Sequence, residues 1–178
     1  MKIRWNRFNI YLAMVMTAAA VCGCQSTSER LAKKRLSTLR LHLEASRDAG
    51  VTTKAIPVYR RQPFTVNVET RPCLNESNVS AAEVVDVVGG FALRIQFDHV
   101  GTTQLEEVST VNRGKRIAVF SQFGENLTEF RWLAAPVISR RITDGVFIFT
   151  PDATREEAEE IAQGLNNTAK KTHTWVDK

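Results

Sequence analysis

Apolar and polar residues alternate with the period of a β-strand in two stretches of the chain. Residues 64–69 read FTVNVE and residues 91–97 read FALRIQF. Alternate side chains lie on the same face of a strand, so each stretch predicts a strand with one buried face. Residues 83–88 lead into Gly89 and Gly90, and a Gly-Gly loop predicts a β-hairpin because a type I′ turn needs positive φ at both loop positions. The buried face of the second strand is predicted to hold Phe91, Leu93, Ile95 and Phe97.

Shorter apolar runs predict further strands at residues 39–43, 56–59, 117–120, 130–135, 137–142 and 146–149. For the first run, a continuous helix over residues 28–47 is the alternative, because apolar residues there also keep heptad spacing. Polar segments predict loops at residues 46–54, 72–80 and 121–129.

Three capping patterns predict helix starts. Ser26 with Glu29 predicts a short helix to Leu36, and Thr103 with Glu106 predicts a short helix that ends before Gly114. Thr154 with Glu157 predicts a helix to about Leu165, and residues 168–178 are predicted to be a flexible tail. Helices inserted among adjacent strands indicate an α+β fold, with two layers and a largely antiparallel sheet covered by helices on one face.

The start of the chain resembles an export signal. Residues 1–7 are basic, and the apolar segment 11–21 that follows is shorter than the roughly 20 residues of a membrane span. Residues 21–24, VCGC, resemble the lipobox of bacterial lipoproteins. We therefore expect cleavage between Gly23 and Cys24, with Cys24 carrying a diacylglyceryl group and palmitate-type acyl chains. An ordinary secretory signal is the alternative.

Charge is unevenly distributed along the rest of the chain. Residues 30–61 contain nine basic and two acidic side chains, whereas residues 62–178 contain 12 basic and 16 acidic ones. The basic part follows the predicted anchor, so residues 24–62 are interpreted as a lipid-anchored linker that could touch anionic lipid, or as a solvated spacer. The remainder lacks the basic excess of a nucleic-acid-binding domain.

Gln25 favours the outer membrane, because aspartate at that position is typical of inner-membrane retention.

Four stretches resemble the periplasmic head subdomain of SecD/SecDF, a protein-export component. They are Phe97-Asp98 with Gly101, residues 112–119 (NRGKRIAV), residues 135–145 (APVISRRITDG) and residues 149–158 (FTPDATREEA). The resemblance covers residues 64–166 and implies a head-like α+β domain at 63–167, with a non-enzymatic role in handling exported polypeptide. The 121–129 loop is longer than the turn of the family. The membrane helices of SecD and their acidic residues are absent, so the resemblance does not imply a proton-driven motor.

No residue pattern in the chain indicates catalysis or metal binding. The sequence has no G-x-S-x-G, H-E-x-x-H or Walker motif. Asp98-His99 is interpreted as a loop and helix-cap pair, and the glutamates near residue 157 as a solvated helix face. His42, His99 and His173 lie too far apart in sequence for zinc spacing. Cys73 is the only cysteine after Cys24 and is expected to be a half-buried apolar side chain, so neither a disulfide, a metal nor a cofactor is predicted.

Two pairs of residues are the candidate partner-binding residues: Arg131 with Trp132, and Arg140 with Arg141. A cross-strand tryptophan covered by arginine stems is the structural alternative. The predicted function is a non-enzymatic, lipid-anchored envelope module that binds a protein or an exported polypeptide. An envelope hydrolase whose site has no linear motif is the second hypothesis.

The lipobox generates a direct prediction. The mature protein should begin at Cys24, and its N-terminal peptide should carry the mass of the lipid modification. Cys24→Ala should leave an uncleaved or soluble form. Mass spectrometry of the N-terminus checks this, and an unmodified peptide that begins at another residue would contradict it.

Overall fold

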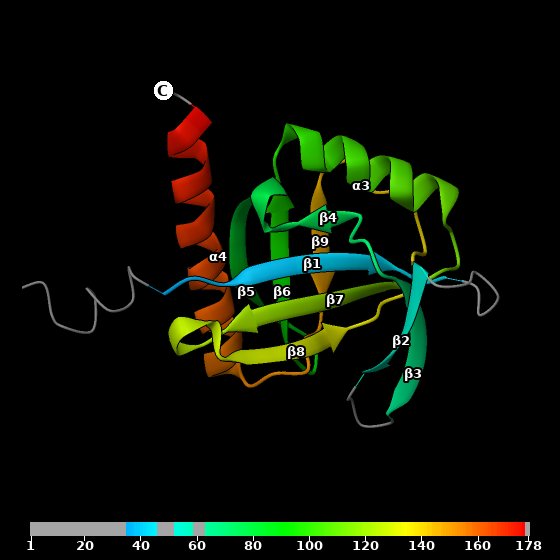
Figure 1. Ribbon diagram of the computed structural model, residues 1–178, viewed down its shortest axis with the longest axis horizontal. Coiled ribbons are helices and arrows are strands. Elements are labelled where there is room, and N and C mark those ends of the chain that lie inside the picture. The colour runs from blue at the N-terminus through cyan, green and yellow to red at the C-terminus, as the bar shows by residue number, and fades with distance from the viewer. Residues whose placement is uncertain (1–34, 46–51, 59–62, 177–178) are drawn as a thin grey trace, which may run out of the picture. The chain divides into compact units, whose positions relative to one another are not determined.

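The computed structural model describes residues 35–45, 52–58 and 63–176. Its strands are β1 (Thr38–Leu43), β2 (Thr53–Val58), β3 (Phe64–Glu69), β4 (Leu74–Asn75), β5 (Val79–Val87), β6 (Gly90–Phe97), β7 (Ile117–Phe123), β8 (Glu129–Ala134) and β9 (Val146–Phe149). Its helices are α3 (His99–Val111) and α4 (Arg155–Val176), with short 3-10 helices η2 (Glu76–Asn78) and η3 (Glu125–Leu127) (Figure 1). The predicted Ser26–Leu36 helix, the signal and Cys24 lie outside the described residues, except that residues 35 and 36 are not helical.

The described strands form three antiparallel sheets. Their orders are β4-β1-β7-β8, β2-β3 and β5-β6-β9. The four-stranded sheet buries Leu39, Leu41 and Val119 in the main core, which α4 and the three-stranded sheet complete. The predicted α+β class with antiparallel pairing is confirmed. The strand at residues 39–43 is also confirmed, and the helix alternative for it is wrong.

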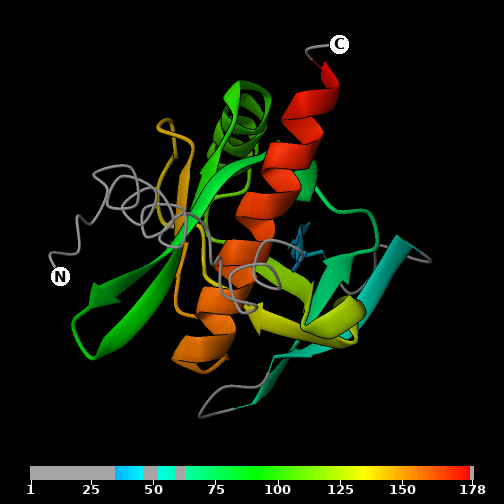
Figure 2. The same cartoon turned by 90° about the vertical axis from the view of Figure 1, so that its left-hand side faces the viewer.

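Helix α4 begins at the predicted cap but is longer than predicted. The Thr154 hydroxyl accepts from the Glu157 backbone N–H at 3.2 Å, and the Glu157 carboxylate accepts from the Thr154 N–H at 2.8 Å, which is the reciprocal geometry of a capping box. The predicted end near Leu165 is wrong, because residues 168–176, which were predicted to be a tail, continue the helix. Asn166 explains the continuation, because its amide bonds both the N–H and the C=O of Ala82 at 2.8 Å and so ties the helix to the edge of β5. Figure 2 shows α4 lying across the strands.

Helix α3 begins earlier than predicted. The Asp98 carboxylate caps it by accepting from the Gly101 N–H at 2.7 Å, whereas the Thr103 hydroxyl bonds the His99 C=O inside the helix. The predicted Thr103/Glu106 start is therefore wrong, and the interpretation of Asp98-His99 as a cap is confirmed. The helix starts as soon as β6 ends, because aspartate is a strong N-cap residue.

The β5–β6 hairpin is confirmed with two changes. Val87 pairs with Gly90, so the loop is Val88-Gly89, one residue earlier than predicted. Both glycines still have positive φ, 88° at Gly89 and 151° at Gly90. Strand β5 begins at Val79 instead of residue 83, and on β6 the side chains of Leu93, Ile95 and Phe97 are buried, as predicted, with Phe91 partly buried.

Two predicted segments differ from the structure in the second half of the chain. Most of the predicted 121–129 loop is secondary structure: β7 runs to Phe123, η3 follows and β8 begins at Glu129. Residues 137–142 do not form a strand. A single bridge pairs Val137 with Arg116, and the backbone of Ile138 bonds Lys115 and Gly114, so the pairing involves only the residues just before β7.

Earlier in the chain, the predicted 46–54 loop gives way to β2 at Thr53, and the predicted 72–80 loop holds β4, η2 and the start of β5. Cys73 is half-buried, as predicted. Burial raises the pKa of its thiol to about 11, and the thiol contacts the Leu41 C=O at 3.2 Å.

The β2–β3 hairpin covers one end of the outer face of the four-stranded sheet. Ile56, Val58, Val66 and Val68 of the hairpin form a second apolar cluster there with Ala118 and Ala135 of the sheet side. The side chains of Phe64 and Trp132 are partly buried against it. The hairpin therefore has its own small core and is not a solvated linker.

Hydrogen bonds fix the hairpin to the end of β1. The Ala45 N–H donates to the Asn67 C=O at 2.9 Å, and His42 Nδ1 donates to the Glu69 C=O at 2.9 Å. Arg116 adds a third link: its N–H donates to the Glu44 carboxylate at 2.8 Å, and its guanidinium lies 5.0 Å from the centre of the Phe64 ring.

The loop geometry of the β5–β6 hairpin predicts the effect of a double substitution. Gly89→Val with Gly90→Val should lower the free energy of unfolding by roughly 1–2 kcal/mol per position, because an L side chain is strained at positive φ. Urea unfolding of the purified chain measures it. Val88→Ala is the matched control, since Val88 is fully exposed in the same loop and should change stability by less than about 0.5 kcal/mol. Equal midpoints for the double variant and the wild type would contradict the assignment.

The environment of His42 predicts a pH dependence of stability. Burial lowers the pKa of His42 below its ordinary 6.5, the bond to Glu69 partly opposes this, and the charge of Arg40 adds to it. The unfolded chain therefore binds the proton first, so stability falls as the pH falls from about 6.5 to the folded pKa. His42→Gln should lose less stability than the wild type between pH 7.5 and pH 5. The other histidines are present in both proteins and contribute equally to both. Urea unfolding measures the free energy of unfolding at each pH, and an equal loss in the two proteins would disprove this role of His42.

Candidate binding groove

A groove lies between the β2–β3 hairpin and the exposed part of the outer sheet face. Its volume is about 530 Å³. The lining residues come from β1, β2, β3, β7 and β8 and the residue after β3: Arg40, His42, Lys54, Ala55, Ile56, Pro57, Val68, Glu69, Thr70, Phe120, Phe130, Arg131 and Trp132. The groove exists because the hairpin covers only one end of the sheet.

Aromatic side chains form the floor of the groove. The Trp132 ring lies 5.1 Å from the Phe120 ring and 5.3 Å from the His42 ring, measured between centroids. Phe130 is 70% exposed, although residues of this type are usually buried. The three rings share one face of the sheet for a simple reason. Phe130 and Trp132 are two residues apart on β8, and Phe120 of β7 pairs with Trp132.

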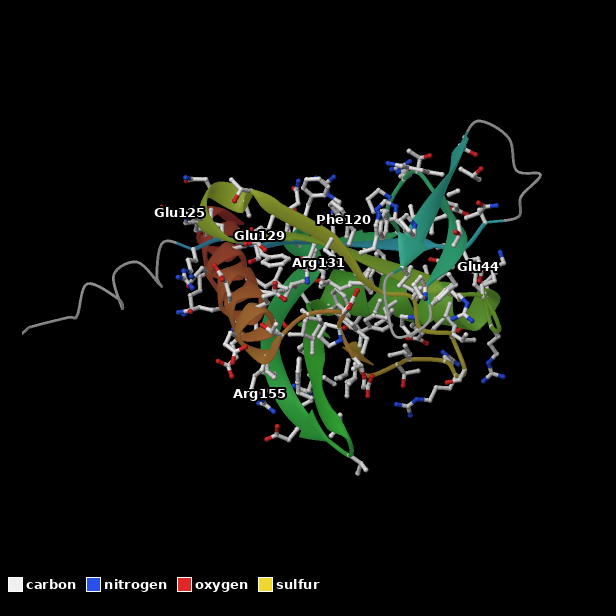
Figure 3. The ribbon with its side chains drawn as sticks, turned by 90° about the horizontal axis from the view of Figure 1, so that it is seen from below. Glu44, Phe120, Glu125, Glu129, Arg131 and Arg155 are labelled. Carbon is white, nitrogen blue, oxygen red and sulfur yellow. The ribbon has the colours of Figure 1, made fainter. Side chains whose placement is uncertain are left out.

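Arg131 points away from the floor, although it lies at the rim. Its guanidinium donates to the Glu157 carboxylate at 3.1 and 3.2 Å and to the Asp152 C=O at 3.1 Å. Its charge also lies 5.7 Å from the centre of the Phe123 ring on the inner face. Figure 3 shows Arg131 and Phe120 on adjacent strands, with Arg131 nearer α4. Arg131 thus connects β8 to α4, and Trp132 is the member of the pair that faces the groove.

Arg140 and Arg141 lie elsewhere. Arg141 forms an ion pair with Glu106 of α3. Arg140 lines a separate cavity of about 200 Å³ beside β9, together with residues that include Ile142 and Ile148. The structure therefore does not bring the four candidate residues into one site.

Two cationic side chains line the groove without a carboxylate partner in the described part of the chain. Arg40 and Lys54 are exposed, and neither belongs to an ion pair among these residues. Glu69 is the acidic residue in the lining, and its backbone C=O holds His42. The groove thus combines an aromatic floor with a cationic rim.

Most groove residues were missed by the sequence analysis. The apolar pattern places Phe120 and Phe130 in strands without indicating a role, and nothing in the pattern around Arg40, His42 or Lys54 indicates one. The parity of Phe130 with Trp132 was visible in the sequence, but the register of β7 against β8 and the position of the hairpin depend on long-range pairing.

Within the described residues, no cluster of three or more His, Cys, Asp or Glu side chains could hold a metal ion. No helix in that part of the chain is long and apolar enough to cross a membrane.

Comparison with known proteins identifies the family. The profile described as SecDF, P1 head subdomain, matches residues 52–169, so the match begins at β2 and includes the hairpin. No curated protein sequence matches the chain.

A structure of SecDF, described as a membrane component that enhances protein export, is similar with a TM-score of 0.54 and 21% identity over 83% of this chain and 71% of that one. SecDF in a super-membrane-facing form gives a TM-score of 0.53 and 20% identity over 80% of this chain, which spans 21% of that one. At such identities the structures establish a shared fold, and the profile match over most of the chain shows that this protein belongs to the SecDF P1 head subdomain family.

Proposed function

We propose that this protein is a non-enzymatic cell-envelope module of protein export that binds extended polypeptide in the groove beside the β2–β3 hairpin. The observation that carries the proposal is the aromatic floor, formed by exposed Phe130 and half-buried Phe120 and Trp132, in a concave site of a domain from this family. The related SecDF is described as a membrane component that enhances protein export.

The physical basis is burial of apolar surface. The groove volume of about 530 Å³ lies in the range of roughly 300–1,000 Å³ that is typical of ligand sites. Each aromatic side chain can bury about 150–250 Å² at an interface and loses little conformational entropy when it does so. A segment of a few residues with apolar side chains would gain this burial without requiring a particular sequence.

The groove residues support a binding role over hydrolysis. His42 is held by the Glu69 backbone and by the edge of Trp132, and the described residues that line the groove include neither serine nor cysteine. A hydrolase of the Ser-His or Cys-His type needs such a nucleophile beside its base. We therefore favour the binding module over the envelope hydrolase.

Anchoring and location are part of the same proposal. Cleavage before Cys24 and lipidation of its thiol would fix the chain to a membrane leaflet. The predicted linker over residues 24–62 is too long, because β1 and β2 belong to the folded domain, so the segment between Cys24 and β1 would lead from the anchor into it. The domain would face the periplasm, and Gln25 favours the outer membrane over the inner one. The basic excess of residues 30–61 is compatible with contact to anionic lipid close to the anchor.

The proposal predicts that the aromatic floor determines affinity for polypeptide. Phe130→Ser and Trp132→Ala should each weaken binding of a fluorescently labelled, unfolded secretory precursor by about tenfold, equivalent to about 1.4 kcal/mol. Fluorescence anisotropy with the purified full chain measures this.

The matched control is Val111→Ser at the end of α3, since Val111 is 76% exposed and lies outside the groove. It should bind as the wild type does. Wild-type affinity in folded Phe130→Ser and Trp132→Ala variants would place the site elsewhere. Turnover of an ester or peptide substrate by the purified chain would contradict the non-enzymatic function.

A further inference from the structure

The free edge of β2 lines the groove. Four consecutive residues of this strand, Lys54–Pro57, belong to the lining. Neighbouring side chains of a strand point to opposite faces, so a surface formed by consecutive residues is a strand edge and not a face. On its other edge β2 pairs with β3, and no other strand pairs with β2 among the described residues.

The pairing register shows which backbone groups of β2 point toward the groove. The Asn67 C=O accepts from Ala45, on the side of β3 opposite to β2. In an antiparallel ladder the N–H and C=O of a residue point the same way, so Asn67 and its partner Ala55 form a non-hydrogen-bonded pair. The Thr70 N–H donates to the Thr52 C=O at 2.8 Å, so Thr52 faces β3. Residues that face the partner strand alternate with residues that face away from it, and Thr52 is three residues from Ala55, so this bond agrees with the assignment.

The N–H and C=O of Ala55 are therefore directed to the free edge, and so is the C=O of Pro57. Pro57 has the same parity and no N–H to donate, which is why proline is tolerated there. Among the described residues, nothing bonds the N–H or the C=O of Ala55. An exposed strand edge of this kind can accept another strand.

The charges beside the edge indicate the side chains of the incoming strand. Arg40 and Lys54 lie in the lining without a carboxylate partner in the described part of the chain, next to Phe130 and Trp132. A segment that combines apolar side chains with a carboxylate would match both features. A lipid acyl chain would match the apolar floor but would leave the backbone groups of Ala55 unused.

We propose that the groove binds an extended polypeptide segment as an additional strand on β2, with its backbone bonded to Ala55, apolar side chains on Phe130 and Trp132, and an acidic side chain beside Arg40 and Lys54. This inference rests on the proposed function and specifies its binding mode. Main-chain bonds supply affinity that does not depend on sequence, while the floor and the cations select acidic-apolar segments.

Backbone methylation of the ligand tests the mode on the wild-type protein. The probes are labelled eight-residue peptides of alternating leucine and glutamate, unmodified or N-methylated at either all leucines or all glutamates. A strand uses the N–H groups of one parity to pair with its neighbour, so one methylated peptide should bind at least about tenfold more weakly than the unmodified peptide, and the other should bind within about twofold. A peptide with lysine in place of glutamate should bind at least about tenfold more weakly.

Two variants at one position test the same bond from the protein side. Ala55→Pro removes the N–H that points to the free edge but leaves the hydrogen bonds between β2 and β3 intact, so it should weaken binding of the unmodified peptide. Ala55→Ser keeps this N–H and should bind the peptide as the wild type does. Circular dichroism verifies that both variants are folded, and the methylated peptides give an independent result if Ala55→Pro is not.

The outcomes separate the two proposals. If the two N-methylated peptides bind as tightly as each other while Trp132→Ala abolishes binding, strand addition is wrong and the polypeptide-binding function stands. If the wild type binds neither these peptides nor an unfolded precursor, the proposed function fails and the inference fails with it. If vesicles of phosphatidylglycerol displace the unmodified peptide while Ala55→Pro has no effect, the occupant is a lipid and the inference is overturned.

Discussion

The structure depends on the need to cover both faces of one sheet. The inner face of the β4-β1-β7-β8 sheet buries leucines of β1 and apolar residues of β7 against α4 and the three-stranded sheet. The outer face is apolar as well, and the β2–β3 hairpin covers only the end near Ala118 and Ala135. Beyond that end lie Phe130, which is exposed, and Phe120 and Trp132, which are half-buried. A domain that leaves aromatic side chains accessible beside a concave surface has the properties of a binding site.

The position of the hairpin is set by a few directional contacts. The Asn67 and Glu69 carbonyls bond to residues at the end of β1, and Arg116 lies between Glu44 and Phe64. These contacts hold β2 with its free edge toward the aromatic floor. Groove, strand edge and the cations of the groove lining are thus consequences of one packing arrangement. The proposed function uses all three to hold extended polypeptide.

Local signals in the sequence predicted much of this fold. Alternation predicted β3 and β6, glycines predicted the β5–β6 hairpin, and the reciprocal Thr154/Glu157 bonds start α4 as expected. Long-range choices were not predictable: Asp98 outcompetes Thr103 as a cap because β6 ends there, and Asn166 extends α4 by bonding β5. In the candidate site, Trp132 was identified, but its neighbour Arg131 faces the opposite side, since adjacent residues of a strand alternate.

Site-specific photo-crosslinking tests the central claim most directly. A benzoylphenylalanine at position 130 would place a reactive carbonyl at the exposed side of the groove, and the same residue at position 111 would place it on an exposed site outside the groove. With a radiolabelled secretory precursor added to envelopes that carry the full chain, the account predicts an adduct to the precursor from position 130 and none from position 111. Adducts from both positions at equal yield, or none from position 130, would contradict polypeptide binding in this groove.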